Sequence, residues 1–299
     1  MGTAVDSTEW LADRFEENRR HLRAVAFRML GSLSEADDAV QESWLRLSRQ
    51  REERVGAIDN LTAWLTTVVA RVALTMLKAR SREESLEAVH LPEPIISRED
   101  GLDPEHEALL ADSVGLALLV VLQTLQPAER LAFVLHDMFG VPFEDIALIL
   151  DKSPAAARQL ASRARRRVQG ADALPDPDLA RQKEVVQAFS AASRSGDFAA
   201  LVAVLDPDVV LRADYGALPA SLKLVRGAEA VAEQALAFNR FAAHAHPALV
   251  NGAPGRVTIV DGKPVAVMGF TVVDGRIKEI DILADPERLA ELDLTVFEV

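Results

Sequence analysis

The sequence contains no cysteine, an absence that excludes disulfide bonds and thiolate metal sites. It also lacks an apolar run long enough to cross a bilayer, because the longest such run, 114–122, is interrupted by Gly115. The first residues include Asp6, Glu9 and Asp13 and do not show the basic-then-apolar order of a signal peptide. We therefore expect a cytoplasmic protein with no membrane partner, no metal site and no cofactor.

Positive charge is scarce and unevenly distributed. Lys and Arg number 33 against 46 Asp and Glu, which gives a formal net charge of −13. Residues 151–168 nevertheless hold one lysine, five arginines and a single acid, Asp151. Because cationic side chains supply most of the affinity for phosphate backbones, a basic segment kept by an acidic protein predicts a polyanionic partner.

The pattern of this basic segment predicts the second helix of a helix-turn-helix. Ser153 can cap the helix with its hydroxyl, and Pro154 suits the first helical position, where no amide hydrogen is needed. Residues 142–150 form a short amphipathic pattern, and 151–153 leave room for a tight turn. In this motif the second helix lies in the major groove, where its first turns meet base edges. The stripe expected to face the core is Ala157, Leu160, Ala161, Ala164 and Val168.

The opposite face of the basic helix carries side chains suited to DNA. Arg158 and Gln159 match the hydrogen-bonding edges of guanine and adenine, whereas residues 165–167 suit phosphates. The alternative is a solvated helix end, because arginine near a helix C-terminus also complements the helix dipole. The residues predicted to bind DNA are Arg158, Gln159, Ser162, Arg163, Arg165, Arg166 and Arg167.

Periodicity predicts helices up to residue 168. The first is expected over about 11–31. The second begins with a capping-box-like pattern at Ser34 and Asp37 and continues through Leu47. Further helices are expected over about 61–82 and over 107–168, the latter with breaks near Pro127 and Gly140. Closely spaced prolines in 92–94 and 170–177 mark extended linkers.

After residue 180 the pattern changes to mixed helix and strand. Helices are expected over about 180–194, 197–205 and 227–242, with a strand over 208–213 and Asp-Gly hairpin turns at 261–262 and 274–275. This order indicates an α+β domain with a curved antiparallel sheet wrapped around helices. The predicted division is a helical domain 8–84, a linker 85–106, a second helical domain 107–170, a linker 171–179, the α+β domain 180–290 and a tail 291–299.

Several motifs occur in a characteristic order. Residues 37–46 read DDAVQESWLR, residues 63–71 read AWLTTVVAR, and residues 126–135 read QPAERLAFVL. They resemble regions 2.2, 2.4 and 4 of bacterial extracytoplasmic-function (group IV) RNA polymerase sigma factors. The last third, with its marks at 250–255 and 285–289, resembles the SnoaL-like extension of the SigJ-like group. The resemblance implies two all-α sigma domains, region 2 and region 4, followed by an α+β SnoaL-like cone.

Such proteins bind core RNA polymerase and promoter DNA, so the resemblance implies two contact surfaces in region 2. The polymerase partners would be the β′ clamp helices and the β flap, while region 4 would read the −35 element. The alternative for residues 37–46 is an ordinary amphipathic helix, and Trp64 is better suited to the core than to base stacking. The polymerase-binding residues would be Asp38, Gln41, Glu42, Leu45 and Arg46. The residues near the −10 element, beside a loop over 50–60, would be Asn60, Trp64, Arg71, Lys78 and Arg80.

The resemblance also marks residues of the C-terminal extension. Residues 214–218 read DYGAL where the group carries Asp-Gly-Gly-Gly-Lys, and His90 stands where many relatives have Trp. The interdomain or regulatory candidates are Leu91, Pro92, Glu93, Pro94, Asp214, Asn251, Gly252, Asp285 and Pro286. Candidates for a ligand pocket are His244, His246 and Asp281. The extension is open to three interpretations: an enzyme, a small-molecule sensor, or a packing module that positions regions 2 and 4.

The favoured interpretation of the whole chain is a non-enzymatic sigma factor whose activity its own C-terminal domain modulates. A helix-turn-helix repressor or activator with a ligand-sensing domain would explain 142–168 and 180–290 equally well but would leave 12–82 without a role. A SnoaL-like isomerase or hydrolase with a DNA-binding appendage would depend on the cavity fold alone.

Overall fold

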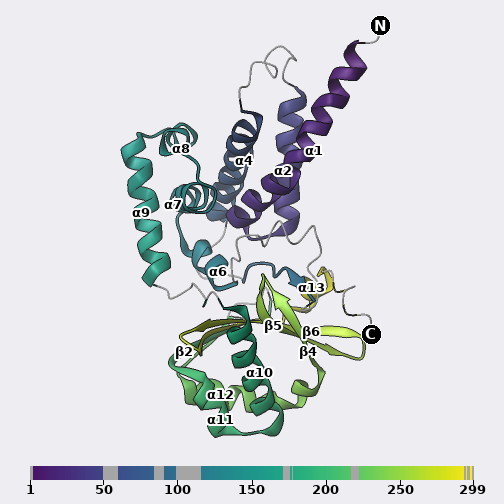
Figure 1. Ribbon diagram of the computed structural model, residues 1–299, viewed down its shortest axis with the longest axis vertical. Coiled ribbons are helices and arrows are strands. Elements are labelled where there is room, and N and C mark those ends of the chain that lie inside the picture. Colours follow the sequence, from purple (N-terminus) through teal and green to yellow (C-terminus); the bar gives the residue numbers. More distant parts are fainter. Residues whose placement is uncertain are drawn as a thin grey trace. The chain divides into compact units, whose positions relative to one another are not determined.

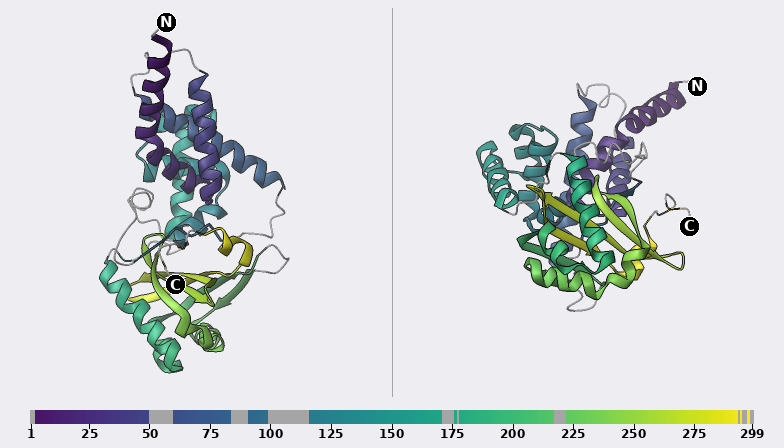
Figure 2. Two further views of the ribbon diagram at one scale, coloured as in Figure 1. Left: turned by 90° about the vertical axis from the view of Figure 1, so that its right-hand side faces the viewer. Right: turned by 60° about the horizontal axis from the view of Figure 1, so that its bottom comes forward.

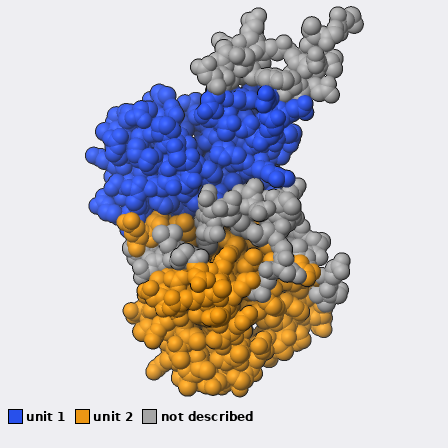
Figure 3. All heavy atoms as spheres, viewed as in Figure 1, with its two compact units in different colours: residues 1–85, 122–167 blue, residues 86–121, 168–299 orange. Residues whose placement is uncertain are grey.

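The computed structural model describes residues 3–49, 60–83, 91–98, 116–170, 176, 178–216, 222–292, 294 and 297. Two compact units are formed, and each draws on separate stretches of the chain (Figure 3). Unit 1 comprises residues 1–85 and 122–167, and unit 2 comprises residues 86–121 and 168–299. The first expected helical domain and most of the second therefore belong to unit 1. Residues 86–121, which include the start of the second expected domain, belong with the C-terminal part of the chain.

Unit 1 is built from helices (Figure 1). Helices α1, α2 and α4 pack on one another, and α7 and α8 pack on α4. The buried side chains that hold this bundle together include Leu22, Met29, Leu65, Leu131 and Ile146. The elements are α1 (Thr3–Leu30), α2 (Leu33–Ser48), α4 (Leu61–Glu83), α7 (Pro127–Phe133), a π-helical turn (Val134–Met138), α8 (Phe143–Leu150) and α9 (Pro154–Gly170).

The start of α2 differs from the sequence prediction. The Ser32 hydroxyl, rather than that of Ser34, accepts the capping hydrogen bond from the Glu35 amide at 3.4 Å. Gly31, at φ 80°, ends the preceding helix, so the chain has already turned when it reaches Ser32. Ser34 lies inside the first turn, and its hydroxyl is 3.0 Å from that of Ser32.

Helix α4 is, over Leu61–Arg80, long and apolar enough to cross a membrane by length and composition alone. Its apolar side chains have a different explanation in this fold. Leu65, Val69 and Leu77 are buried, and the helix packs on α1, α2, α7 and α8. The apolar character of α4 is accounted for by core packing.

Unit 2 contains a seven-stranded sheet in the order β1-β4-β5-β6-β7-β2-β3. All neighbouring strands are antiparallel except β2 and β7, which are parallel. The predicted antiparallel sheet thus contains one parallel pair; β3, a helix and three further strands separate β2 from β7 in the chain, so the two are not joined by the tight turn that would make them antiparallel. The strands are β1 (Ile96–Ser97), β2 (Leu205–Asp214), β3 (Leu222–Arg226), β4 (Ala245–Val250), β5 (Ala253–Val260), β6 (Lys263–Val273) and β7 (Arg276–Leu283).

Helices cover one face of this sheet (Figures 1 and 2). Phe189 of α10 and Leu201 of α11 join strand residues such as Phe270 and Ile280 in one buried cluster. The helices of unit 2 are α10 (Leu179–Ser195), α11 (Phe198–Val204), α12 (Ala228–Ala237), a 3-10 helix (Asn239–His244) and α13 (Pro286–Ala290), and α6 (Leu116–Thr124) begins in this unit.

The predicted hairpins are confirmed. Asp261 and Gly262 have φ values of 50° and 70°, and Asp274 and Gly275 have 52° and 74°. Two successive positive φ values are those of a type I′ turn, whose twist matches the strands on either side. The expected loop over 50–60 lies outside the described residues except for Asn60, and His90 also lies outside them.

Candidate nucleic-acid interface

Helix α9 has the two faces that its sequence predicts. Its stripe of apolar residues is buried, with Ala157, Ala161 and Ala164 fully so. Asp151 adopts the left-handed conformation at φ 54° to end α8, and the Ser153 hydroxyl accepts a hydrogen bond from the Ala156 amide at 3.2 Å. The turn and the cap together set the direction of α9 against α8, as in a helix-turn-helix.

The arginines of α9 fall into two groups. Arg158, in the first turns, is exposed, and its guanidinium lies 5.1 Å from the ring centre of Phe143. Gln159 and Arg166 are also exposed, whereas Ser162 is half-buried. These four side chains line the outer face of the helix, where the sequence predicts contact with bases and phosphates.

The other three arginines are engaged with acids of the same unit. Arg163 and Arg167 both pair with Glu129, at 3.1 Å and 2.6 Å, and Arg165 pairs with Asp137. About half of the Arg163 and Arg167 side-chain surface remains exposed, at 52% and 51%. These ion pairs brace α9 against α7 and the π-helical turn, and DNA binding by the three arginines stays a prediction.

The residues predicted to meet the −10 element lie along α4. The Asn60 side-chain oxygen accepts a hydrogen bond from the Ala63 amide at 3.0 Å, so this residue caps the helix. An asparagine directly before a helical pattern of apolar residues is a signal for a helix N-cap, and the prediction of a base contact at Asn60 did not consider it. Trp64 is half-buried, which leaves both of its proposed roles open, and Lys78 is exposed.

Arg71 and Arg80 of α4 make contacts inside unit 1. The Arg71 Nη2 donates to the backbone carbonyl of Leu148 in α8 at 3.1 Å, and Arg80 pairs with Glu35 at 3.2 Å. Arg71 therefore ties the helix predicted to face the −10 strand to the helix-turn-helix. Both arginines stay predicted DNA contacts.

The polymerase-facing candidates share one side of α2. Asp38, Gln41, Leu45 and Arg46 are exposed, and Leu45 keeps 39% of its surface in water despite its apolar side chain. Glu42 is half-buried and pairs with Arg46 at 2.9 Å. An acidic surface with an exposed leucine suits a protein partner better than DNA, because phosphates would repel its carboxylates.

Arg130 is a buried cation that the sequence prediction did not single out. Its Nη1 donates to the Met29 carbonyl at 2.8 Å and so joins α7 to α1. Burial, with the nearby charge of Arg80, lowers the pKa of Arg130 to about 9. A signal was available in the sequence, since Arg130 directly precedes the apolar run 131–135.

In unit 2, the segment between the two helical domains is held by the C-terminal part of the chain. The Leu91 amide donates to Asp214 Oδ2 at 3.0 Å. Arg288 bridges the same two residues, with Nη1 at 2.8 Å from Asp214 Oδ2 and Nη2 at 2.5 Å from the Leu91 carbonyl. The sequence motifs at 91–94, 214 and 285–289 thus meet at one place, and Arg288 is the member that the predicted set omitted.

A second contact follows four residues later. The Ile95 amide donates to Asn251 Oδ1 at 2.6 Å, and the Asn251 amide donates to the Ile95 carbonyl at 2.8 Å. Asn251 and Gly252, with φ values of 50° and 78°, form the turn between β4 and β5. Asp285 caps α13 by accepting from the Glu287 amide at 3.0 Å, which places Pro286 at the start of that helix.

Unit 2 also contains a partly open cavity of about 280 Å³. The three residues predicted for a ligand pocket do not line it, and that prediction is corrected here. His244 and His246 are exposed. Asp281 is buried and pairs with Arg212 at 2.7 Å, while its neighbours Ile280 and Ile282 face the cavity, because successive side chains of a strand point to opposite faces. In the described part of the chain, no three histidines or acids gather closely enough to hold a metal ion.

Comparison with known proteins agrees with this arrangement. The chain matches the Sigma-70 region 2 family over residues 14–83 and the Sigma-70 region 4 family over residues 115–168. It is 40% identical to the ECF RNA polymerase sigma factor SigJ of Mycobacterium tuberculosis, covering 92% of this chain and 91% of that one. It is 34% identical to the probable ECF sigma factor SigI of the same species, covering 92% and 93%.

A solved structure is also similar. The crystal structure of Mycobacterium tuberculosis SigJ matches with a TM-score of 0.77 and 36% identity, covering 95% of this chain and 99% of that one. The chain belongs to the extracytoplasmic-function sigma factors of bacterial RNA polymerase.

Proposed function

We propose that this protein binds core RNA polymerase and directs it to promoters, with region 4 reading the −35 element and region 2 opening and holding the −10 element. The observation that carries the proposal is α9, a capped helix with a buried apolar stripe and Arg158 and Gln159 exposed in its first turns. Sigma family membership supplies the partner, and the exposed acidic side of α2 is suited to the polymerase clamp. The site of action is the cytoplasm, where the polymerase works.

We further propose that the packing of region 2 on region 4 within unit 1 restrains activity. The −35 and −10 elements are centred about 25 base pairs apart, which is roughly 85 Å at about 3.4 Å per base pair. The contact between Arg71 and Leu148 holds the two regions side by side. The regions must therefore separate before one molecule reaches both elements.

The C-terminal domain is proposed to regulate rather than to catalyse. Among the described residues that line its cavity there is no histidine and no carboxylate. Histidine and carboxylates are the most frequent general acids and bases, so the lining offers little for chemistry of the isomerase or hydrolase kind; Tyr215, which also lines the cavity, is its one phenol.

Run-off transcription with purified core polymerase tests the sigma assignment. The full chain added alone to core polymerase is expected to give promoter-dependent transcripts, because a sigma factor supplies both core binding and promoter recognition. Leu45→Glu on the exposed side of α2 should reduce core binding, and Leu179→Glu, on a similarly exposed leucine of α10, is the matched control. A repressor or activator would give no transcripts without a second sigma factor, and that result would reject the proposal.

A further inference from the structure

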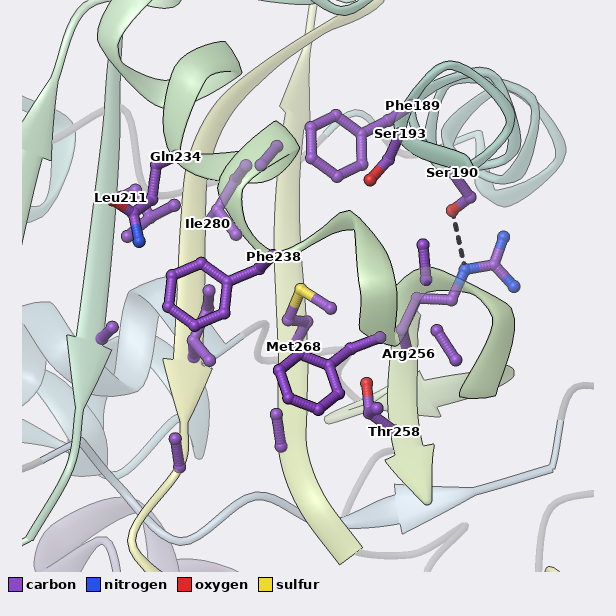
Figure 4. Close-up of a pocket in the computed structure, with 18 of the residues that line it drawn as sticks. Phe189, Ser190, Ser193, Leu211, Gln234, Phe238, Arg256, Thr258, Met268 and Ile280 are labelled. Atoms are coloured by element: carbon purple, nitrogen blue, oxygen red, sulfur yellow. Dashed lines mark hydrogen bonds between the residues drawn. The ribbon is translucent and has the colours of Figure 1, made fainter. Parts of the chain in front are cut away.

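The cavity of unit 2 lies between the sheet and the helices that cover it, and it is partly open (Figure 4). Its volume of about 280 Å³ is close to the lower end of the range of small-molecule pockets, about 300–1,000 Å³. An apolar cavity of about 150 Å³ in another protein takes up one benzene molecule. The space in this domain therefore suits one compact molecule of about two fused rings.

Aromatic side chains gather around this cavity, although the chain has few of them. Of its 11 phenylalanines and one tyrosine, four phenylalanines and the tyrosine line the space, namely Phe189, Tyr215, Phe238, Phe241 and Phe270. The Phe189 and Phe270 rings meet edge to face, with 5.4 Å between their centres. Tyr215 and Phe238 each keep 43% of their surface exposed, so the rings extend from the buried end of the cavity to its open side. Such a lining favours a flat aromatic ligand.

Two hydroxyl groups of the lining are buried and have no hydrogen bond to any residue that the structure describes. Ser193 of α10 is 8% exposed and Thr258 of β5 is 2% exposed, so the two come from the helix layer and from the sheet (Figure 4). Ser190 differs, because its hydroxyl donates to the Val186 carbonyl at 2.7 Å and accepts from Arg256 Nε at 2.9 Å. The Ser193 and Thr258 hydroxyls can be satisfied only from the cavity itself, by water or by a polar atom of a ligand.

Gln234 of α12 adds a third donor to the lining. Lys223 donates from Nζ to Gln234 Oε1 at 2.6 Å. Because an ammonium group only donates, this bond fixes which end of the amide is the oxygen and leaves the amide nitrogen as the end available to a ligand. Two hydroxyls and an amide nitrogen can all donate, and a carbonyl oxygen is an acceptor that suits each of them.

The lining is suited to a neutral molecule. Arg256 is the one charged side chain among the described residues that line the cavity. Its guanidinium is bonded to Ser190 and is turned away from Met268 and Phe238 (Figure 4). Apolar surroundings penalise an unpaired charge of either sign, because burial removes its hydration. The cavity therefore favours a neutral ligand over both an anion and a cation.

We propose that the C-terminal domain binds a compact neutral aromatic molecule that carries a carbonyl oxygen. Its rings lie among Phe189, Phe238 and Met268, and its oxygen accepts a hydrogen bond from the Ser193 or the Thr258 hydroxyl. The inference gives a ligand class to the domain that is proposed to regulate. Binding is measured without polymerase or promoter, so its failure is distinguishable from failure of the proposed function.

Equilibrium dialysis of the full chain tests the proposal with three naphthalenes that differ in one substituent. The neutral probe is 2-acetylnaphthalene, and 2-naphthoate and 2-naphthylmethylamine are its anionic and cationic counterparts. The expected result is saturable binding of the ketone, with both ions bound weaker by about tenfold or more, because each loses hydration in the cavity. If the ketone does not bind, or if either ion binds as tightly as the ketone, the assignment is wrong.

Conservative variants locate the carbonyl. Replacing both hydroxyls, by Ser193→Ala with Thr258→Val, should weaken binding of the ketone by about threefold to tenfold, as expected for loss of one hydrogen bond. Binding of 2-ethylnaphthalene, which has the same shape without the oxygen, should not weaken. Thr271→Val is the matched control, because Thr271 is buried on β6 next to Phe270 and so points to the opposite face of the sheet. Equal losses in the double variant and in Thr271→Val, or no loss in the double variant, would overturn the assigned contact.

A bulky variant tests the cavity itself. Ala266 of β6 is the register partner of Thr258 and lines the cavity. Ala266→Phe places a ring in this space and should abolish saturable binding of the ketone. Binding that survives this substitution would take place elsewhere on the protein, and the proposal would be rejected.

Discussion

Asp214 shows how one buried carboxylate organises the segment between the helical domains. Its side chain is 1% exposed and lies 2.8 Å from Arg288, whose own side chain is 26% exposed. Arg288→Met removes the cation facing a buried acid, so we expect the free energy of unfolding of this unit to fall by about 3 kcal/mol. Urea unfolding followed by far-ultraviolet circular dichroism measures the change.

The matched control for Arg288 is Arg276→Met, an exposed arginine on β7. It should alter the free energy of unfolding by less than about 0.5 kcal/mol, as is usual for surface sites. Equal effects of the two substitutions would show that the pairing of Asp214 with Arg288 contributes little to stability.

His21 lies at the contact between regions 2 and 4 and is expected to make the stability of unit 1 depend on pH. Its ring is 2.9 Å from the Thr66 hydroxyl and packs edge-on against Phe139. Burial, with the nearby charge of Arg28, lowers the pKa of His21 below 6.5. The unfolded chain therefore binds the proton more readily, and the stability that neutral His21 provides is lost as pH falls from about 6.5 toward the lowered pKa.

We expect the melting temperature of unit 1 to drop between about pH 7.5 and pH 5.5, and His21→Gln to flatten this dependence, since glutamine cannot titrate. Thermal unfolding followed by tryptophan fluorescence measures it, because Trp44 and Trp64 lie in unit 1. His246→Gln, on an exposed histidine of unit 2, should leave the slope unchanged. Parallel slopes for the unaltered protein and His21→Gln would count against this role.

At the scale of the element, we expect the outer face of α9 to divide its work along the helix. Its first turns recognise DNA bases, and its later turns bind the DNA phosphates. Arg158 lies in the first turns, so Arg158→Ala should cost about 1–3 kcal/mol of binding and relax the base preference at one position of the −35 element. Arg166 lies two turns further on and should act on phosphates. Arg166→Ala should weaken all sequences alike and reduce the salt dependence by about one unit of slope.

Fluorescence anisotropy with −35 duplexes, intact and base-substituted, at several salt concentrations measures both effects. Arg226→Ala, on an exposed arginine of β3 in unit 2, provides the control and should bind like the unaltered protein. If Arg158→Ala and Arg166→Ala have the same sequence and salt profiles, the division of roles along the helix is incorrect.

Elements with local signals were predictable from the sequence, and elements that depend on distant partners were not. The cap at Ser153, the stripe of α9 and the Asp-Gly turns each arise within a few residues, and the structure has all of them. Strand β1 pairs with residues 249–250, more than a hundred positions away, so its extended residues were interpreted only as a linker. The lining of the cavity escaped prediction for the same reason, because residues such as Arg256 and Ser190 meet only in the folded domain.

At the scale of the whole molecule, the central question is whether regions 2 and 4 separate when the protein works. In unit 1 the Arg71 side chain reaches the Leu148 carbonyl, a contact incompatible with binding sites centred roughly 85 Å apart at about 3.4 Å per base pair. If the packed arrangement opens on the promoter, core polymerase and DNA are the ligands that shift the equilibrium from packed to separated regions.

The absence of cysteine makes this opening directly measurable. Thr75→Cys on α4 and Lys152→Cys in the turn before α9 are exposed positions of the same compact unit, and each takes a fluorophore without competing thiols. Energy transfer between them should be high in the free protein and fall sharply when core polymerase and a promoter are both present, because the two regions then occupy separate elements.

A pair at Thr75 and Arg20, both in region 2, should keep its transfer efficiency throughout. Unchanged transfer in the first pair on a transcribing complex would mean that regions 2 and 4 stay together, and the proposed restraint would be wrong.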